Sequence, residues 1–282
     1  MVGDAPETGE NMKLLWSTQI EEPGLWEPHC RGRLVRSGGK SWFLYMRSRQ
    51  VVGAAVGPEG LTEPEVLISG LQIDLPGRWF ASAQIPDGLI CGEDCCLDLR
   101  TLRRVDADVR QEYRDKGEFG GYLIPQMSYR FGDYAVSQNQ RSGFCCRRGD
   151  APVWRFSAQG YLYTDIVRSP DREDAIVFGT DGHGGHFYML DLATGKPICD
   201  LNTRGTNHYV YTEGSFYLLS REQRSKLLRV SAYDGSVTEE LLLEGKINTS
   251  SRILRDGAYL LATTFRYKAG TPIAMIVHYA EL

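Results

Sequence analysis

Residues 174–201 read DAIVFGTDGHGGHFYMLDLATGKPICDL, and this stretch decides the fold. Two apolar segments flank a glycine-rich turn, and a second turn, ATGK, closes the unit. A glycine-rich loop that cradles a phosphate would lead directly into a helix, but a strand-like segment follows here. Gly182, Gly184 and Gly185 are therefore predicted to serve a hairpin loop, where glycine readily adopts positive φ.

The same pattern recurs along the chain. Strands comparable to the one at Ile176 begin at five other positions: Trp42, Leu89, Tyr134, Tyr217 and Leu260. Successive starts are 47, 45, 42, 41 and 43 residues apart. Each follows a Gly or Asp turn and precedes a second strand, and several units add a further turn and a third strand. Repeats of this length with several strands each are typical of propeller blades.

The chain is therefore expected to be all-β. It should form a single β-propeller with six blades of four antiparallel strands, although a diverged seventh blade stays open. Residues 13–282 would make the propeller domain and residues 1–12 a flexible N-terminal tail. The last repeat ends on a third strand, and KLLWSTQI at 13–20 resembles the outer-strand segment PVWRFSAQ at 152–159. We expect the N-terminal strand to close the last blade, with Trp16 and Trp154 as equivalent wedges between blades.

One unit also resembles a known family. The matching residues are Asp181, Gly182, Leu190, Asp191, Thr194, Gly195 and Lys196. In this order they are similar to the repeat of the PQQ-like, or quinoprotein-type, β-propeller superfamily. Segments 95–105 and 230–240 are fainter copies. The resemblance implies the propeller fold and says almost nothing about chemistry, because functional sites are grafted on folds.

Composition limits the partners. The 282 residues are 42% hydrophobic and 24% charged, with a net charge of −4. A general affinity for nucleic acid or an anionic membrane is therefore not expected. The N-terminal residues lack the pattern of a signal peptide, and no apolar run is long enough to span a bilayer. Seven cysteines without a secreted framework favour reduced thiols and a cytoplasmic location.

The adjacent cysteines and two of the histidines are candidates for cofactor or metal chemistry. Some quinoprotein dehydrogenases of the resembled superfamily hold an adjacent-cysteine disulfide over their cofactor, and this chain has two adjacent pairs, Cys95–Cys96 and Cys145–Cys146. Neighbours in a strand point to opposite faces, so one cysteine of each pair is expected in the core. His183 and His186 with Asp181 could bind a metal, but a solvated hairpin tip is preferred. No cofactor and no metal are expected.

A recurring aromatic suggests a binding face. Where each blade begins, an aromatic follows a glycine or proline turn, and polar residues accompany it. The candidate ligand-binding residues are Trp26, His29, Arg78, Trp79, Tyr122, Gln126, Tyr161, Tyr163, Asp165, His208 and Tyr209. In a propeller these connections gather at one mouth of the central channel, and Tyr, Trp and Arg are typical of binding hot spots. Packing between blades explains the same aromatics equally well.

Three functions follow. The first is a non-catalytic module that binds a protein or a small polar or carbohydrate ligand at the aromatic mouth. The second is a lyase or hydrolase acting on a sugar-like substrate, for which Asp165, His29, His208 and Arg78 would have to converge. The third is a cytosolic assembly scaffold. The polar run at 99–118 is expected to loop out between blades two and three, as a solvated insertion or a docking loop.

Overall fold

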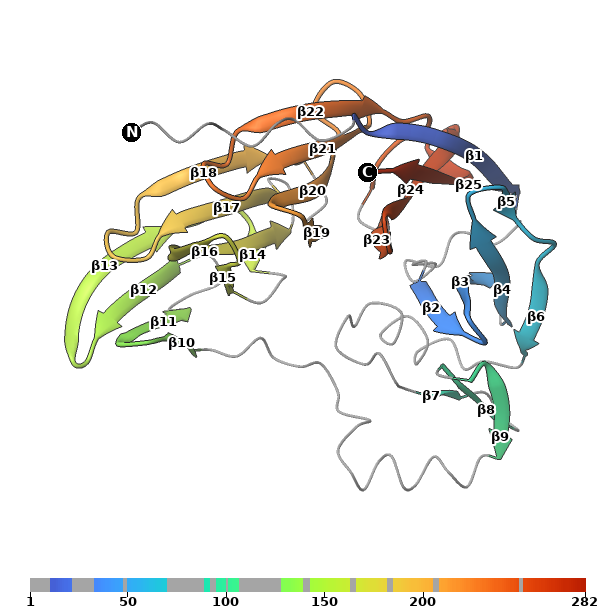
Figure 1. Cartoon of the computed structure of the whole chain (residues 1–282), viewed down its shortest axis with the longest axis horizontal. Coiled ribbons are helices and arrows are strands. Elements are labelled where there is room, and N and C mark those ends of the chain that lie inside the picture. The colour runs from blue at the N-terminus through green and yellow to red at the C-terminus, as the bar shows by residue number, and fades with distance from the viewer. Residues whose placement is uncertain are drawn as a thin grey trace.

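The computed structural model describes residues 11–21, 33–47, 50–69, 89–91, 95–99, 101–106, 128–138, 143–162, 166–181, 185–204, 208–248 and 251–282. These residues form antiparallel sheets joined by turns. The sheets β10–β13, β14–β18, β19–β22, β23–β25 with β1, β2–β6 and β7–β9 follow one another along an arc, with β10–β13 and β7–β9 at its two ends (Figure 1). Among the described residues there is no apolar helix of membrane-spanning length.

Blades one to three occupy the first half of the chain. Blade one contains β2 (Arg33–Ser37), β3 (Lys40–Arg47), β4 (Gln50–Gly57), β5 (Gly60–Leu61) and β6 (Glu65–Ile68). Blade two contains, among the described residues, β7 (Leu89–Cys91), β8 (Cys95–Asp98) and β9 (Arg103–Asp106). Blade three contains β10 (Ser128–Phe131), β11 (Tyr134–Gln138), β12 (Gly143–Arg148) and β13 (Ala151–Ser157).

Blades four to six complete the set. Blade four contains β14 (Tyr161–Leu162), β15 (Val167–Ser169), β16 (Arg172–Asp181), β17 (His186–Asp191) and β18 (Pro197–Asn202). Blade five contains β19 (Tyr209–Thr212), β20 (Ser215–Ser220), β21 (Lys226–Ser231) and β22 (Val237–Leu242). Blade six contains β23 (Ile253–Asp256), β24 (Tyr259–Lys268), β25 (Thr271–Glu281) and β1 (Lys13–Glu21).

Six sheets at the predicted spacing confirm the propeller prediction. The six repeat starts fall in β3, β7, β11, β16, β20 and β24. The extra strand of blade one arises because β5 and β6 pair with different parts of β4. Between them lies Pro64, which has no N–H to continue the ladder. In blade four, β14 and β15 share β16 in the same way.

The N-terminal strand closes the last blade, as the sequence predicts. β1 pairs antiparallel with β25 from Lys13↔Glu281 to Glu21↔Ala274, and Figure 1 shows the two strands side by side. Met12, just before β1, is buried and its N–H donates to Glu239 Oε1 at 2.6 Å. Residues 1–10 lie outside the described residues.

Apolar clusters lie between blades. One joins Phe178 of blade four to Phe144 of blade three, and another joins Phe187 of blade four to Phe216 of blade five. A third joins Tyr217 to Leu260 of blade six, and a fourth links blade six to blades one and two. Alternating residues of a strand serve opposite neighbours, because side chains alternate across the sheet. From blade three through blades four, five, six and one to blade two, each blade therefore shares an apolar cluster with the following one.

The outer-strand tryptophans are equivalent, as predicted. Each follows a one-residue register shift in its strand, between Leu14 and Trp16 in β1 and opposite Cys146 and Arg147 in β13. Trp16 Nε1 donates to the Gly57 carbonyl of blade one at 2.9 Å, and Trp154 Nε1 donates to the Leu192 carbonyl of blade four at 2.8 Å. Both indoles therefore tie an outer strand to the following blade.

The turn of the best-matching repeat, in blade four, recurs in the fainter copies. In blade four, Asp191 Oδ1 accepts from Thr194 N and Oγ1, both at 2.7 Å, and Gly195 N donates to Asp191 O. In blade five, Gly235 N donates to Ser231 O in the same way. These turns place Leu192 and Ala232 in the core.

Blade two repeats this turn and corrects one expectation. Leu102 N donates to Asp98 O, and Thr101 Oγ1 donates to Asp98 Oδ2 at 3.1 Å. Leu99 is buried, and Arg103–Asp106 form β9. The polar run at 99–118 was expected to loop out, which is wrong for its first part, because that part is the turn and outer strand of a blade. Residues 107–118 lie outside the described residues.

Candidate functional site

Most of the candidate residues at the mouth lie outside the described residues. These are Trp26, His29, Arg78, Trp79, Tyr122, Gln126, Tyr163 and Asp165. Tyr161 belongs to β14, and His208 and Tyr209 lie together at the start of β19, half-buried. The Tyr209 ring packs edge-on against Phe187 of blade four and Phe216 of its own blade, with centroids 5.4 and 5.6 Å away. Tyr209 thus contributes to packing between blades.

The two ends of the blades differ in their loops. Successive turns of an antiparallel meander alternate between two ends of the sheet. The connections between blades and the loops between second and third strands therefore share one end, here called the mouth end. The first and last hairpin turns of each blade share the other, here called the turn end.

The mouth-end loops of blades four to six are hydrogen-bonded to one another. Arg221 N donates to the Thr203 carbonyl at 3.2 Å, across the β20–β21 loop and the connection that precedes β19. Ser225 Oγ donates to the Gly245 carbonyl at 2.8 Å. Lys246 and Phe265 exchange two backbone hydrogen bonds, at 2.8 and 2.9 Å. The described parts of these loops therefore tie the three blades together at this end.

This edge is cationic. Its exposed basic residues, called here the basic rim, are Arg204, Arg221, Arg224, Lys246, Arg266 and Lys268. The same loops expose two carboxylates, Glu222 and Glu244. When the exposed Asp200 and Glu240 of the adjoining strand ends are also counted, six exposed cations stand against four exposed carboxylates, a local excess of +2 on a chain whose net charge is −4. A chain-wide charge count therefore hides the local field at this edge.

Part of the basic rim is held in place. Arg266 Nη2 lies 2.6 Å from Glu244 Oε1, and Lys246 Nζ lies 5.8 Å from the centroid of the Tyr267 ring. Asn248 Nδ2 donates in turn to the Tyr267 hydroxyl at 2.7 Å. Surface ion pairs of this kind contribute little to stability, so their effect is to orient charge.

Sequence reasoning missed the basic rim, although a signal was present. Arg204, Arg224, Lys246 and Arg266 are separated by 20, 22 and 20 residues. Half of a blade repeat carries the chain from one mouth-end loop to the next mouth-end loop. Basic residues at half the repeat length therefore predict a shared edge, a periodicity that a search for full repeats overlooks.

His186 is a second polar centre, and its prediction was wrong. A solvated hairpin tip was expected, but His186 is only 5% exposed because it opens β17 on the same face as buried Tyr188. Its Nδ1 lies 2.5 Å from Asp200 Oδ1, and its ring stacks on Tyr188. Among the described residues, its buried Nε2 has no hydrogen-bond partner. His183 lies outside the described residues.

Hydrogen bonds between threonine hydroxyls and backbone groups hold the segment that contains His186. His186 N donates to Thr180 Oγ1 at 3.1 Å, and Thr180 Oγ1 donates to the Gln159 carbonyl at 2.5 Å. Thr203 Oγ1 donates to the Gly185 carbonyl at 2.8 Å. The strand ends of blade four are thereby joined to both neighbouring connections.

The buried thiols are unreactive in this setting. Cys145 and Cys146 are both free, and Cys146 is fully buried while Cys145 is half-buried, as expected for neighbours in a strand. Burial raises the pKa of Cys146 to about 11, with a further contribution from Cys145. Burial likewise raises the pKa of Cys199 to about 12. Thiols with such pKa values are poor nucleophiles at neutral pH, because the thiolate is the reactive form.

Comparison with known proteins places the chain only by fold. No protein-family model matches it. A stretch of 103 residues, 35% of the chain, is 24% identical to ASTRA-associated protein 1 of Saccharomyces cerevisiae (strain JAY291). This match spans 23% of that protein's length.

Three solved structures are similar in outline. BamB from Moraxella catarrhalis is 14% identical, with coverage of 88% of this chain and 69% of that chain and a TM-score of 0.36. The Cps50 (Swd1) β-propeller domain of Myceliophteria thermophila is 11% identical, with coverage of 86% and 67% and a TM-score of 0.34. BBS1N, solved in complex with ARL6DN, is 10% identical, with coverage of 96% and 97% and a TM-score of 0.48. The strand topology of this chain identifies it as a β-propeller protein.

Proposed function

We propose that the chain is a non-catalytic β-propeller module that binds an acidic segment of a protein partner along the basic rim at the mouth end. The observation that carries this proposal is the joined edge of blades four to six, where six exposed cations stand on the mouth-end loops and on the adjoining end of β24, linked by backbone hydrogen bonds. Rigid loops lower the entropic cost of binding, and complementary charge speeds association and selects the partner.

A binding function also suits the placement of the titratable groups. His278, Cys146 and Cys199 have shifted pKa values because they are buried within sheets. His278 is hydrogen-bonded inside blade six, and the two thiols are packed in the apolar clusters between blades. A catalytic site would bring such groups to a common point that substrate reaches. The mouth aromatics predicted from the sequence, including Trp79 and Tyr122, lie outside the described residues, and their part in this surface stays a prediction.

The relative found by sequence comparison points in the same direction. ASTRA-associated protein 1 is named for its association with ASTRA. A module that works beside a protein assembly needs an exposed, ordered surface for a protein ligand, which the basic rim provides. The assembly-scaffold hypothesis is therefore retained as part of this proposal, with the partner defined by its acidic chemistry.

A charge-reversal experiment tests the proposal. A short fluorescein-labelled peptide rich in Glu and Asp is titrated with the full chain, and binding is followed by fluorescence anisotropy. Arg221→Glu with Arg224→Glu should weaken binding about 10-fold or more, since paired opposite charges become like charges. Rising salt should weaken binding of the unmodified chain, because exposed charges are screened.

The control makes the same change in net charge at the other end. Lys196→Glu with Arg255→Glu alters two exposed turn-end cations and should leave peptide affinity unchanged. Equal losses in both double variants would show that only net charge matters and would contradict the proposal. Binding of a single-stranded oligonucleotide as tightly as the acidic peptide would assign the basic rim to nucleic acid instead.

A further inference from the structure

One aromatic side chain at the turn end is far more exposed than packing requires. Tyr233, in the β21–β22 turn, is 70% exposed. The β17–β18 turn has the same backbone hydrogen bonds, and Ala193 occupies the equivalent position. The turn therefore forms without an aromatic residue, so the geometry of the fold does not explain Tyr233.

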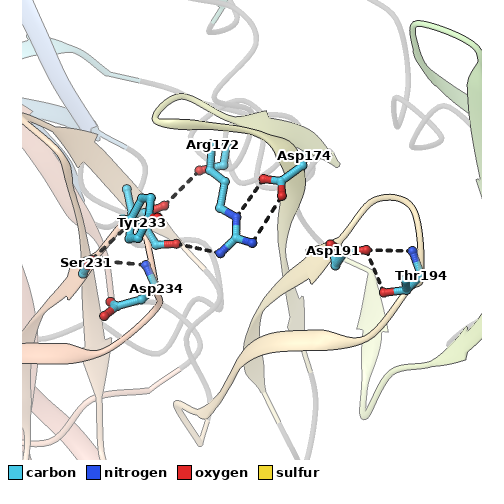
Figure 2. A network of polar contacts seen from close by, with 9 residues as sticks. Arg172, Asp174, Asp191, Thr194, Ser231, Tyr233 and Asp234 are labelled. Atoms are coloured by element: carbon cyan, nitrogen blue, oxygen red, sulfur yellow. Dashed lines mark hydrogen bonds and ion pairs between the residues drawn. The ribbon is translucent and has the colours of Figure 1, made fainter. Parts of the chain in front are cut away.

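The exposed ring is nevertheless fixed. Ser231 Oγ accepts hydrogen bonds from Tyr233 N and Asp234 N, each at 3.3 Å. Arg172 of blade four donates from Nη1 to the Tyr233 carbonyl at 3.1 Å, and its guanidinium carbon lies 5.7 Å from the ring centroid. Figure 2 shows Arg172 between Tyr233 and Asp174. The guanidinium thus supports the ring by a cation–π contact.

Arg172 is itself held by a carboxylate. Its Nε and Nη2 donate to the two oxygens of Asp174, at 2.7 and 3.2 Å (Figure 2). Beside it, the Tyr211 hydroxyl donates to Asp171 Oδ1 at 2.8 Å, and Ser169 Oγ donates to the Ala232 carbonyl at 3.2 Å. Blades four and five are therefore joined directly beside the Tyr233 turn, and the ring lies against the Arg172 guanidinium of this junction.

The surroundings of the ring are acidic. Five exposed carboxylates lie in the turns around it, and with Tyr233 they define what we call the acidic turn surface: Asp171, Glu173, Asp174, Glu213 and Asp234. Hydrogen bonds from Arg172 lower the pKa of Asp174, and hydrogen bonds from Ser236 lower the pKa of Asp234. Both carboxylates are therefore charged at neutral pH, and Arg172 neutralises only part of the field.

We propose that the acidic turn surface is a second docking site, which binds a segment of another protein rich in Lys and Arg and seats a cationic side chain against the exposed Tyr233 ring. Tyrosine and arginine dominate interface hot spots, and an aromatic already held in its bound position loses little entropy on binding. A cation over a tyrosine ring is attracted by the ring's quadrupole, and the surrounding carboxylates add to that attraction.

The occupant is a different protein and not a second copy of this chain. The basic rim is cationic, but it lies at the opposite end of the same blades. If the basic rim of one copy bound the acidic turn surface of the next copy, the copies would stack head to tail without closing. Such stacking produces open filaments. Two ends of opposite charge instead suit a module that holds two unlike partners at once.

The test uses the full chain and a short fluorescein-labelled peptide rich in Lys and Arg. The unmodified chain should bind the peptide in low salt, and Tyr233→Ala should weaken binding about 10-fold or more. Tyr233→Phe keeps the ring and should retain most of the affinity. Glu59→Gln removes an exposed carboxylate from the corresponding turn of blade one and should have no effect.

Several outcomes would overturn the proposal. The first is that the unmodified chain does not bind the basic peptide. The second is that Tyr233→Ala binds the basic peptide as tightly as the unmodified chain does. The third is that this surface binds the acidic peptide as tightly as the basic peptide. Light scattering that shows chains assembling with rising concentration would assign the surface to self-association. The double variant Arg221→Glu with Arg224→Glu should keep its affinity for the basic peptide, so failure at one end is distinguishable from failure at the other.

Discussion

Two interfaces between blades each contain an outer-strand tryptophan, but the surroundings of the two tryptophans differ. At the internal interface of blades three and four, Trp154 is 8% exposed and packs against Gly195. At the interface of blades six and one, Trp16 is half-buried and stacks on Tyr279, with centroids 5.2 Å apart. Both indoles donate to the following blade, but Trp154 packs closely against blade four, whereas the ring that stacks on Trp16 belongs to blade six itself and further polar bonds reach blade one.

The second interface joins parts of the chain that are far apart in sequence, which explains its polar reinforcement. Asp256 of blade six accepts from Ser41 of blade one at 2.5 Å and from the Tyr279 hydroxyl at 2.7 Å. His278 of β25 lies 2.8 Å from Ser17 of β1 and 2.8 Å from Thr264 of β24. Directional bonds fix the register of a strand pair that no short loop aligns.

The largest expected effect is the loss of stability when each of the two tryptophans is replaced by alanine. Trp154→Ala should lower the free energy of unfolding by about 3–5 kcal/mol, because it removes a buried ring and leaves a cavity. Trp16→Ala should cost about 1–3 kcal/mol, since the half-buried ring hides less apolar surface from water. Urea denaturation of both variants measures the difference. Equal losses would show that the two interfaces are energetically alike.

The next effect is a pH dependence of stability that comes from His278, one of the polar groups that hold β1 to β25. Thr264 Oγ1 donates to the Glu244 carbonyl at 2.5 Å, so it accepts from His278 Nε2, and Nδ1 accepts from Ser17. This arrangement holds the neutral ring, and burial lowers the pKa of His278 from 6.5 to about 4. The unfolded chain binds a proton near pH 6.5 while the folded chain does not.

Stability should therefore be lost as the pH falls from about 6.5 to about 4, by about 3 kcal/mol from this group. Unfolding free energies of the native chain and of His278→Gln, measured at pH 7 and pH 4, isolate this contribution from that of the carboxylates. An identical pH dependence in both proteins would show that His278 does not titrate as described.

The smallest effect tests how tightly Trp154 is packed. Gly195 has a φ of +69°, and a Cβ there would lie 2.5 Å from Trp154 Cδ2. Gly149 has a φ of +59° with open space around it. Gly149→Ala should cost about 1 kcal/mol for backbone strain alone, and Gly195→Ala about 1–3 kcal/mol more for overpacking. Thermal unfolding compares the pair, and equal shifts would mean that the indole moves aside freely.

The fold was predictable because the repeat is written in local patterns. Strand starts such as Trp42 and Ile176 follow turn residues at a near-constant step, and the likeness of residues 13–20 to 152–159 located the closing strand. His186 was misplaced because flanking glycines suggested an exposed tip. Its alternation with Tyr188 and Leu190 in β17 was the better signal.

The surfaces were harder to predict, because they are assembled from loops of different blades. The loops that carry Arg204 and Arg221 are joined by the hydrogen bond from Arg221 N to the Thr203 carbonyl, and Tyr233 meets Arg172 only across the interface of blades four and five. A net charge of −4 conceals both of these regions. The mouth aromatics, from Trp26 to Tyr163, stay predictions.

The pairing of β1 with β25 has a consequence for biosynthesis. Lys13 leaves the ribosome long before Glu281, so β1 is made well before the strand with which it pairs. Until then its backbone N–H and C=O groups remain available to other strands, including those of neighbouring nascent chains. Refolding should accordingly end with a slow closing step that is sensitive to protein concentration, and chaperones that shield this segment should raise the yield of closed molecules.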